Sequence, residues 1–442
     1  MMTMSQDYRS EITALCIVCI LFSGSFSLFI VKATQDAEEP FLKFEVNNVF
    51  AGYLNHSINI TNPSAQNVQN GELIVPLIRN ETARHQVAIT NISSTIGQPF
   101  ISNDSSGNIY AHWNGIKLNR NQSLTVTINY SVLSFSVRYL IDENRAYDYN
   151  TSSDLYKKYT EPEPLIQSDN STIISKAHNV TEKSTTIPES VFKIYSFVTK
   201  HLRYAIQEEE KGAVWALENG VGDCSEYSYL FVALCRAIGI PARVQAGFAF
   251  HYSSETLEDG HMWAEYYLEN YGWIPVDATW QLFNMLDSRH FSAIGSIPED
   301  TTYANYVFNT PADVSLEDAQ AVELQPYSSA ITDSVFAKNA KKAAENLNQA
   351  KIAAFIGKTL GAYWVFSSEV THAEQNLLES KILLQEAIEQ LSETKATECF
   401  QKASQVTQEL NNILIKISTL YISIALIIMI SVLLIFWCKT KR

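Results

Sequence analysis

The last long segment of the chain, Ile417 to Cys438, contains no charged residue over 22 positions. A helix of this length rises about 33 Å, enough to cross a hydrocarbon core of roughly 30 Å. Lys439, Lys441 and Arg442 follow it directly. Positive charge beside a span marks the cytoplasmic side of a membrane, and Trp437 suits that interface. We therefore expect a membrane helix at 417–438 and a cytoplasmic basic tail at 439–442.

A second uncharged run, Ile12 to Val31, covers 20 positions near the start of the chain. Its length and its weakly charged N-terminal flank favour an uncleaved membrane anchor, whereas Val31 and Ala33 would suit the cleavage site of a signal peptide. We assign residues 1–38 to this anchor or signal. Both alternatives place the middle of the chain outside the cytoplasm, with the protein in the cell membrane.

The composition limits the partners. The formal charge of −15 argues against nucleic acid, because binding a phosphate backbone needs a basic surface. Six cysteines in 442 residues are too few and too scattered for a disulfide scaffold. The length suggests two to four domains.

Asn-x-Ser/Thr sequons gather in the first half of the chain and are absent after Asn179. Ten occur, well above what chance pairing of these residue types predicts, so we expect a glycosylated external surface. The candidate asparagines are Asn55, Asn59, Asn80, Asn91, Asn103, Asn121, Asn129, Asn150, Asn170 and Asn179.

Residues 39–142 have the pattern of β-strands. Leu124, Val126, Ile128 and Tyr130 alternate with polar residues, which is typical of a half-buried strand. Breaks rich in Asn, Ser and Gly separate the apolar runs, and we expect an immunoglobulin-like β-sandwich. Residues 143–187 are polar and are expected to form a connector with short helical pieces. The expected strands are Phe41–Val46, Glu72–Leu77, Val87–Thr90, Asn108–Trp113, Ser123–Tyr130 and Val132–Leu140.

Residues 311–416 are expected to form a helical hairpin or coiled-coil stalk that leads into the membrane span. Two apolar stripes at spacings of three and four give one buried face per helix. Such a stalk offers a surface for self-association. The first stripe is Ala337, Ala340, Ala343, Ala344, Leu347, Ala350 and Ala354, and the second is Leu377, Leu378, Ile382, Leu383, Ala387, Ile388 and Leu391.

A buried helix is predicted to begin at about Cys224, because apolar residues recur from Tyr227 to Ile238 at helical spacing before Gly239 and Pro241 end it. A cysteine on the first helical turn faces unpaired N–H groups and the positive end of the helix dipole, which lowers a thiol pKa. Cys224 is therefore a candidate nucleophile. Cys235 lies about 16 Å further along the helix, too far for a disulfide with Cys224, and is expected to be inert.

Two short strands with a turn between them follow this helix. On a strand, His261, Trp263 and Glu265 share one face. A second strand that ends at Asp277 can place this carboxylate beside His261, where it would fix the tautomer of the ring and stabilise the imidazolium. Cys224, His261 and Asp277 together predict a Cys-His-Asp triad.

The motifs in this region resemble those of the transglutaminase-like superfamily, whose core is a papain-like thiol acyl-transfer fold. They read Gly222-Asp-Cys224, Arg236-Ala-Ile-Gly-Ile-Pro-Ala-Arg243, His261-Met-Trp-Ala-Glu265 and Gly272-Trp-Ile-Pro-Val-Asp277. The resemblance covers about 190–285, and we expect an α+β catalytic domain at 188–310. The order of sandwich, core and anchor is similar to surface-exposed microbial members, and an archaeal source would fit it.

The resemblance implies that Cys224 is the nucleophile, His261 the general base and acid, and Asp277 the orienting carboxylate. It implies a thioester intermediate that forms when protein or peptide amides react. The apolar runs and the sequons place these substrates outside the cell, and we expect no cofactor and no metal. Trp215 and Tyr204 are weak candidates for a side-chain oxyanion donor, since packed core aromatics are the simpler interpretation of both.

The motifs do not separate hydrolysis from cross-linking, because both begin with the same thioester, and a glycan amidase would use the same residues. The alternative of another class is a non-catalytic surface module that keeps the fold for binding or assembly, and the intact triad counts against it. Glu255, Glu258 and Asp259 lack the spacing of a known calcium loop.

Overall fold

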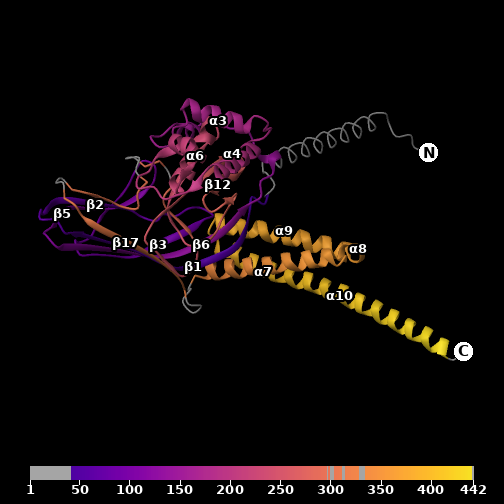
Figure 1. The fold of residues 1–442 in the computed structure, drawn as a ribbon. Helices are drawn as coiled ribbons and strands as arrows, with labels where there is room; N and C mark the ends of the chain where they lie inside the picture. Colours follow the sequence, from indigo (N-terminus) through magenta and orange to yellow (C-terminus); the bar gives the residue numbers. More distant parts are fainter. Residues whose placement is uncertain (1–40, 296, 299–302, 311–313, 328–333, 441–442) are drawn as a thin grey trace, which may run out of the picture. The chain divides into compact units, whose positions relative to one another are not determined.

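The computed structural model describes residues 41–295, 297–298, 303–310, 314–327 and 334–440. Residues 42–442 cluster into one unit (Figure 1). The apolar run near the N-terminus, expected to be an anchor or signal, lies outside the described residues, as do Lys441 and Arg442 of the expected cytoplasmic tail.

The period-two pattern in residues 39–142 produces long strands that share one core. Leu124, Val126, Ile128 and Tyr130 are fully buried on one strand, as their alternation predicts. This strand, β6, joins two of the expected runs and pairs with β1 along nearly its whole length. The strands are β1 (Phe44–Asn62), β2 (Val68–Pro76), β3 (His85–Ser94), β4 (Phe100–Asn103), β5 (Ile109–Leu118) and β6 (Gln122–Tyr139).

Later parts of the chain complete both sheets. One sheet has the order β10-β17-β1-β6-β14, with β3 also paired to β6, and the other has the order β16-β2-β5-β4. The sheets that residues 39–142 begin therefore also contain strands from beyond residue 142. The immunoglobulin-like form of this region stays a prediction. The added strands are β10 (Glu255–Leu257), β14 (Met285–Leu286), β16 (Val307–Asn309) and β17 (Glu317–Pro326).

Strand β17 also corrects the expectation that residues 311–416 are helical throughout. It pairs antiparallel with β1, from Thr61 opposite Glu317 to Gly52 opposite Pro326. Only Val322 and Leu324 of this strand are buried. The period-two signal is therefore too short to be recognised in the sequence.

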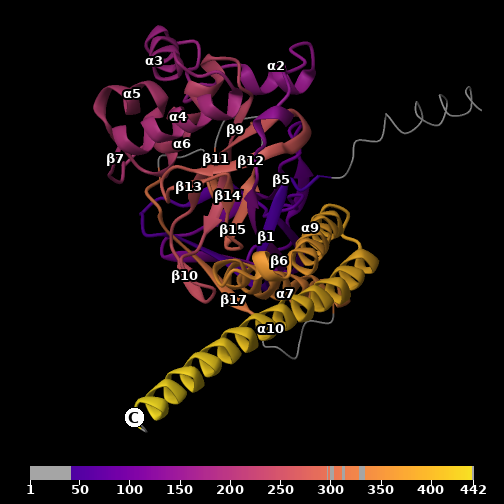
Figure 2. The same ribbon diagram turned by 90° about the vertical axis from the view of Figure 1, so that its right-hand side faces the viewer.

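The middle of the chain forms an antiparallel sheet of order β13-β12-β11-β9-β15, with helix α6 packed against β11 and β9 (Figure 2). The expected connector contains η1 (Glu143–Arg145), α2 (Asp154–Thr160) and α3 (Ser171–Thr181). The other elements are α4 (Ile187–His201), β7 (Arg203–Tyr204), α5 (Gly212–Asn219), β8 (Val221–Gly222), α6 (Cys224–Ala237), β9 (Ala242–Ala249), β11 (His261–Leu268), η2 (Glu269–Tyr271), β12 (Gly272–Asp277), β13 (Leu282–Phe283) and β15 (His290–Ile294).

The C-terminal helices form a bundle that packs back against β1. Glu45 of β1 accepts hydrogen bonds from Lys351 and Lys381, at 2.7 and 2.6 Å. The first apolar stripe is buried as expected, except that Ala353 replaces Ala354. Of the second stripe, Leu377, Ala387 and Ile388 are buried, Ile382 and Leu383 are half-buried, and Leu378 and Leu391 are exposed. The helices are α7 (Val335–Thr359), α8 (Ala362–Val365), α9 (Ser367–Glu389) and α10 (Glu393–Thr440).

Helix α10 changes character along its length. Among the residues of α10 whose side chains the structure describes, Ile417 is the last that is buried, and Tyr421 to Trp437 are exposed at every position. In Figure 1 this part of α10 extends alone beyond the bundle. The helix is long and apolar enough to cross a membrane.

Candidate active site

The N-terminus of α6 is fixed by a capping box. Asp223 accepts a hydrogen bond from the backbone N–H of Ser225 at 3.1 Å, and Glu226 accepts one from the N–H of Asp223 at 3.0 Å. A Cβ at Gly222 would lie only 2.3 Å from the Cβ of Glu226, so the tight approach needs a glycine. Cys224 therefore occupies the first helical position, and its N–H lies in the turn that has no intrahelical acceptor.

Strands β11 and β12 bring His261 and Asp277 together. Ala264 pairs with Val276, a register that makes Asp277 and His261 diagonal neighbours on one face. His261 Nε2 and Asp277 Oδ2 are 2.8 Å apart. Because Nε2 is used in this way, Nδ1 is the ring nitrogen left for the thiol of Cys224.

The surroundings of His261 favour its charged form. Burial lowers its pKa, but the charge and hydrogen bond of Asp277, with a hydrogen bond to Cys224, outweigh burial and raise the pKa to about 9. Asp277 is fully buried; burial raises its pKa, but His261 and His290 together hold the pKa well below its usual range. The pair therefore favours an imidazolium beside a carboxylate at neutral pH.

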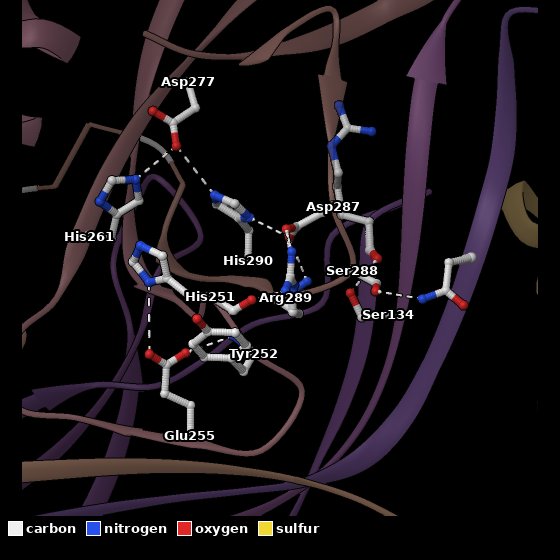
Figure 3. A network of polar contacts seen from close by, with 12 residues as sticks. Ser134, His251, Tyr252, Glu255, His261, Asp277, Asp287, Ser288, Arg289 and His290 are labelled. Atoms are coloured by element: carbon white, nitrogen blue, oxygen red, sulfur yellow. Dashed lines mark hydrogen bonds and ion pairs between the residues drawn. The ribbon is translucent and has the colours of Figure 1, made fainter. Parts of the chain in front are cut away.

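A second histidine contacts the same carboxylate and was missed by the sequence analysis. His290 places Nε2 at 3.3 Å from Asp277 Oδ2 and Nδ1 at 2.8 Å from Asp287 Oδ1 (Figure 3). Both ring nitrogens face carboxylates, so the ring donates from both. Burial lowers the pKa of His290, but the two carboxylates raise it to about 9. The only signal in the sequence is an Asp three residues before a His, which is too common to be informative.

The ligand atoms of His261, Asp277 and His290 lie within 4.8 Å of one another, a spacing at which side chains can hold a metal ion. Here the hydrogen bonds account for the cluster, since both rings share Asp277 Oδ2.

Cys224 and His261 line one cavity of about 320 Å³, which Tyr204, Asp259 and Tyr303 also border. Tyr204 is 53% exposed, so it is not the packed core residue we expected. The parallel pairing of β7 with β8 sets Tyr204 opposite Gly222 and so brings it close to Cys224. Trp215 is half-buried on α5 and is not among the residues that line this cavity.

The other motif residues build the scaffold around the site. Glu265 is buried and accepts hydrogen bonds from Arg243 and Gln245, at 2.8 and 2.6 Å. The Arg243 guanidinium stacks over Trp273, with 4.3 Å between its Cζ and the ring centroid. Arg84, from the loop before β3, approaches Glu265 at 3.5 Å and joins the sheets to the core.

Two more cysteines have side chains that the structure describes, Cys235 and Cys399, and both are unpaired. Cys235 and Cys399 are buried, and burial raises the pKa of both thiols, that of Cys399 to about 12. Neither has the surroundings of a nucleophile. None of the ten sequon asparagines is buried. Their glycosylation stays a prediction.

Comparison with known proteins finds a family model that matches this part of the chain. Residues 174–278 match the sequence model of the transglutaminase-like superfamily, a range that contains Cys224, His261 and Asp277 and begins within the expected connector. A protein-glutamine gamma-glutamyltransferase of Pseudomonas aeruginosa is 38% identical over 68 residues, which cover 14% of this chain and 10% of that protein. The chain thus spans about a tenth of the length of this curated relative.

Two solved structures are similar in part. A protein from Cytophaga hutchinsonii, provisionally named a cysteine protease, is 17% identical with a TM-score of 0.47, covering 64% of this chain and all of that one. The periplasmic domain of TgpA from Pseudomonas aeruginosa, bound to ethylmercury, is 14% identical with a TM-score of 0.29, covering 55% of this chain and 92% of that one.

Proposed function

We propose that this chain, which carries a domain of the transglutaminase-like superfamily at residues 174–278, is a cysteine-dependent enzyme that acts on amide bonds of proteins or peptides. The observation that carries the proposal is the 2.8 Å contact between His261 and Asp277 beside a cysteine at the start of a helix. A thiol, a histidine and an orienting carboxylate are the parts that acyl transfer through a thioester requires.

The reaction begins with the Cys224 thiolate and the His261 imidazolium. The thiolate adds to the amide carbonyl carbon and forms a C–S bond, with the negative charge moving to the carbonyl oxygen. The C–N bond then breaks as His261 gives its proton to the leaving amine. Water or a second amine attacks the thioester and returns a proton to His261, and cleavage of the C–S bond regenerates the thiolate.

The N–H of Cys224 at the helix start is the first donor for the oxyanion. Tyr204 is the side-chain candidate, because it borders the same cavity as Cys224 and is exposed. Asp277 remains ionised throughout, since both histidines stabilise its charge, and it holds His261 with Nδ1 toward the thiol.

In this proposal α10 anchors the protein in the cell membrane, with the catalytic domain outside the cell and the C-terminus in the cytoplasm. The exposed apolar length of α10 and the sequons, whose asparagines are not buried, support it. Protease added to intact cells should then digest the sequon-rich region and leave a C-terminal epitope protected. An epitope digested as fast as the rest would end this topology.

The catalytic part is tested by labelling the full chain with an electrophilic probe that carries a glutamine-like amide, then mapping the modified residue. Labelling at Cys224 that is lost in His261→Ala supports the enzyme. Equal labelling of Cys224 in both proteins would instead favour a non-catalytic module. Release of amine from peptides, compared with release of glycan from glycopeptides, separates a peptide amidase or transferase from a glycan amidase.

A further inference from the structure

The end of the bundle at the α7–α8 turn exposes an unusual set of large apolar side chains. Trp364 is 92% exposed and Phe355 is 71% exposed. On α7 the set follows one helix face at spacings of three and four. We call this set the bundle tip, and it comprises Ile352, Phe355, Ile356, Tyr363, Trp364 and Val365.

The bundle tip lies beside the place where α10 leaves the bundle. The Tyr421 hydroxyl donates a hydrogen bond to the Leu360 carbonyl at 2.7 Å. Four residues earlier, Ile417 is the last residue that α10 buries. In Figure 1, α8 lies at the end of the bundle from which α10 continues alone.

The length of the exposed part of α10 indicates where the bundle tip would lie relative to a membrane that this helix crosses. Tyr421 to Trp437 are 17 residues, about 25 Å of helix, whereas the hydrocarbon core is roughly 30 Å thick. About 20 residues are needed, so with Trp437 at one interface the core reaches back to about Ser418. Tyr421 and the neighbouring turn then lie at or within the opposite boundary. A tilted helix would need more residues and would place the tip deeper.

We propose that the bundle tip is a lipid-binding surface that inserts into the outer interface of the membrane that α10 crosses. The inference rests on the membrane span proposed above. Trp and Tyr prefer this interfacial region, where the ring is buried and its polar atom stays hydrated. With α10, the tip gives the extracellular part a second contact with the bilayer, so that the protein has a set orientation instead of a free hinge.

The charged groups near the tip are compatible with this depth. Lys416 pairs with Glu369 at 2.6 Å, one turn on the bundle side of Tyr421, where headgroups and water would meet it. Lys358 is exposed on α7 within the tip. Its long side chain can extend its ammonium group to the phosphates while its methylenes stay among the apolar side chains.

The test uses the full chain in nanodiscs of phosphatidylcholine whose acyl chains are brominated either near the headgroup or near the methyl end, because bromine quenches nearby tryptophan. Subtracting the emission of Trp364→Phe from that of the wild type isolates Trp364. We expect the shallow bromines to reduce this component by about twofold or more, and the deep bromines to reduce it less.

Two matched variants calibrate the result. Trp437→Phe isolates a residue of the proposed span, and Trp215→Phe isolates a half-buried residue of the catalytic domain. If Trp437 is quenched but Trp364 is quenched no more than Trp215, the tip proposal fails and the span remains. If Trp437 is not quenched either, the span itself fails. If the Trp364 emission is not quenched but shifts to the blue as more chains are placed in each disc, the lipid-binding proposal fails, and a second copy of the chain covers the tip instead.

Discussion

The transglutaminase-like core and the C-terminal bundle differ in where their charged side chains lie, which is in the interior of the core and at the surface of the bundle. In the core, Glu265 is buried with Arg243 and Arg84, and Asp277 is buried between two histidines. In the bundle, most of the buried residues of α7 are alanines, and ion pairs such as Lys402 with Glu379 lie at the surface. Buried charges tolerate little change because removing one partner leaves the other unpaired, whereas exposed pairs contribute little. The histidine and aspartate proposed for catalysis and the buried charges that tolerate substitution least therefore lie in the same sheet.

The sharpest test of this contrast is at the proposed nucleophile. Cys224→Ser should abolish amide cleavage or transfer while the thermal unfolding temperature stays near that of the wild type, because the exchange is nearly isosteric. Cys235→Ser, in the same helix, should lower the unfolding temperature and leave turnover unchanged, because it places a polar hydroxyl in a buried site. If Cys224→Ser retained activity, Cys224 would not be the nucleophile and the proposed mechanism would be wrong.

The buried ion network should give the largest loss of stability. Glu265→Ala leaves Arg84 and Arg243 without their shared carboxylate, and we expect the free energy of unfolding to fall by about 3–5 kcal/mol. Chemical denaturation in detergent measures it. A loss below 1 kcal/mol would mean that the core treats charge no differently from the bundle.

The histidines around Asp277 should make stability depend on pH. The pKa of each of His261 and His290 is raised to about 9 in the folded chain, above the ~6.5 of an unfolded histidine. Their contribution is therefore complete below pH ~6.5 and is lost as the pH rises through 9. The free energy of unfolding should fall between these values, and less steeply in His290→Gln. A flat or rising profile would contradict the charged pair.

The buried alanines of α7 should respond to size instead of charge. Ala340 is fully buried on α7, and Ala340→Leu should cost about 1–3 kcal/mol because the added atoms overfill the packed interior. The exposed Lys338→Leu on the same helix is the matched control and should change stability little. Equal effects of the two variants would argue that the α7 interior is loosely packed.

The smallest effect is expected at the bundle surface. Lys402→Ala removes the partner of the exposed Glu379 and should change the free energy of unfolding far less than Glu265→Ala does, with high salt reducing the difference further. A loss of unfolding free energy as large as that of Glu265→Ala would mean that surface and buried ion pairs contribute equally in this protein.

The sequence predicted those features whose signal is local. The helix that begins at Cys224, the strands that bear His261 and Asp277, and the alanine stripe of α7 each follow from spacing along one element. His290 was missed because its partners are assembled by β12 and the segment before β15, which no periodicity links. The packing of the helices against β1 could not be predicted either, because Glu45 pairs with Lys351 and Lys381, which are more than 300 residues away in the chain.

The pairing of β1 with β17 has a consequence for how the protein is made. The two strands are separated by more than 250 residues, and the catalytic sheet lies between them in the chain. At a ribosomal rate of about 5–20 residues per second, one edge of β1 waits roughly 10–50 s for its partner. During that interval the exposed edge can bind another strand or a chaperone. The protein would thus complete this sheet only when the chain has been synthesised through β17.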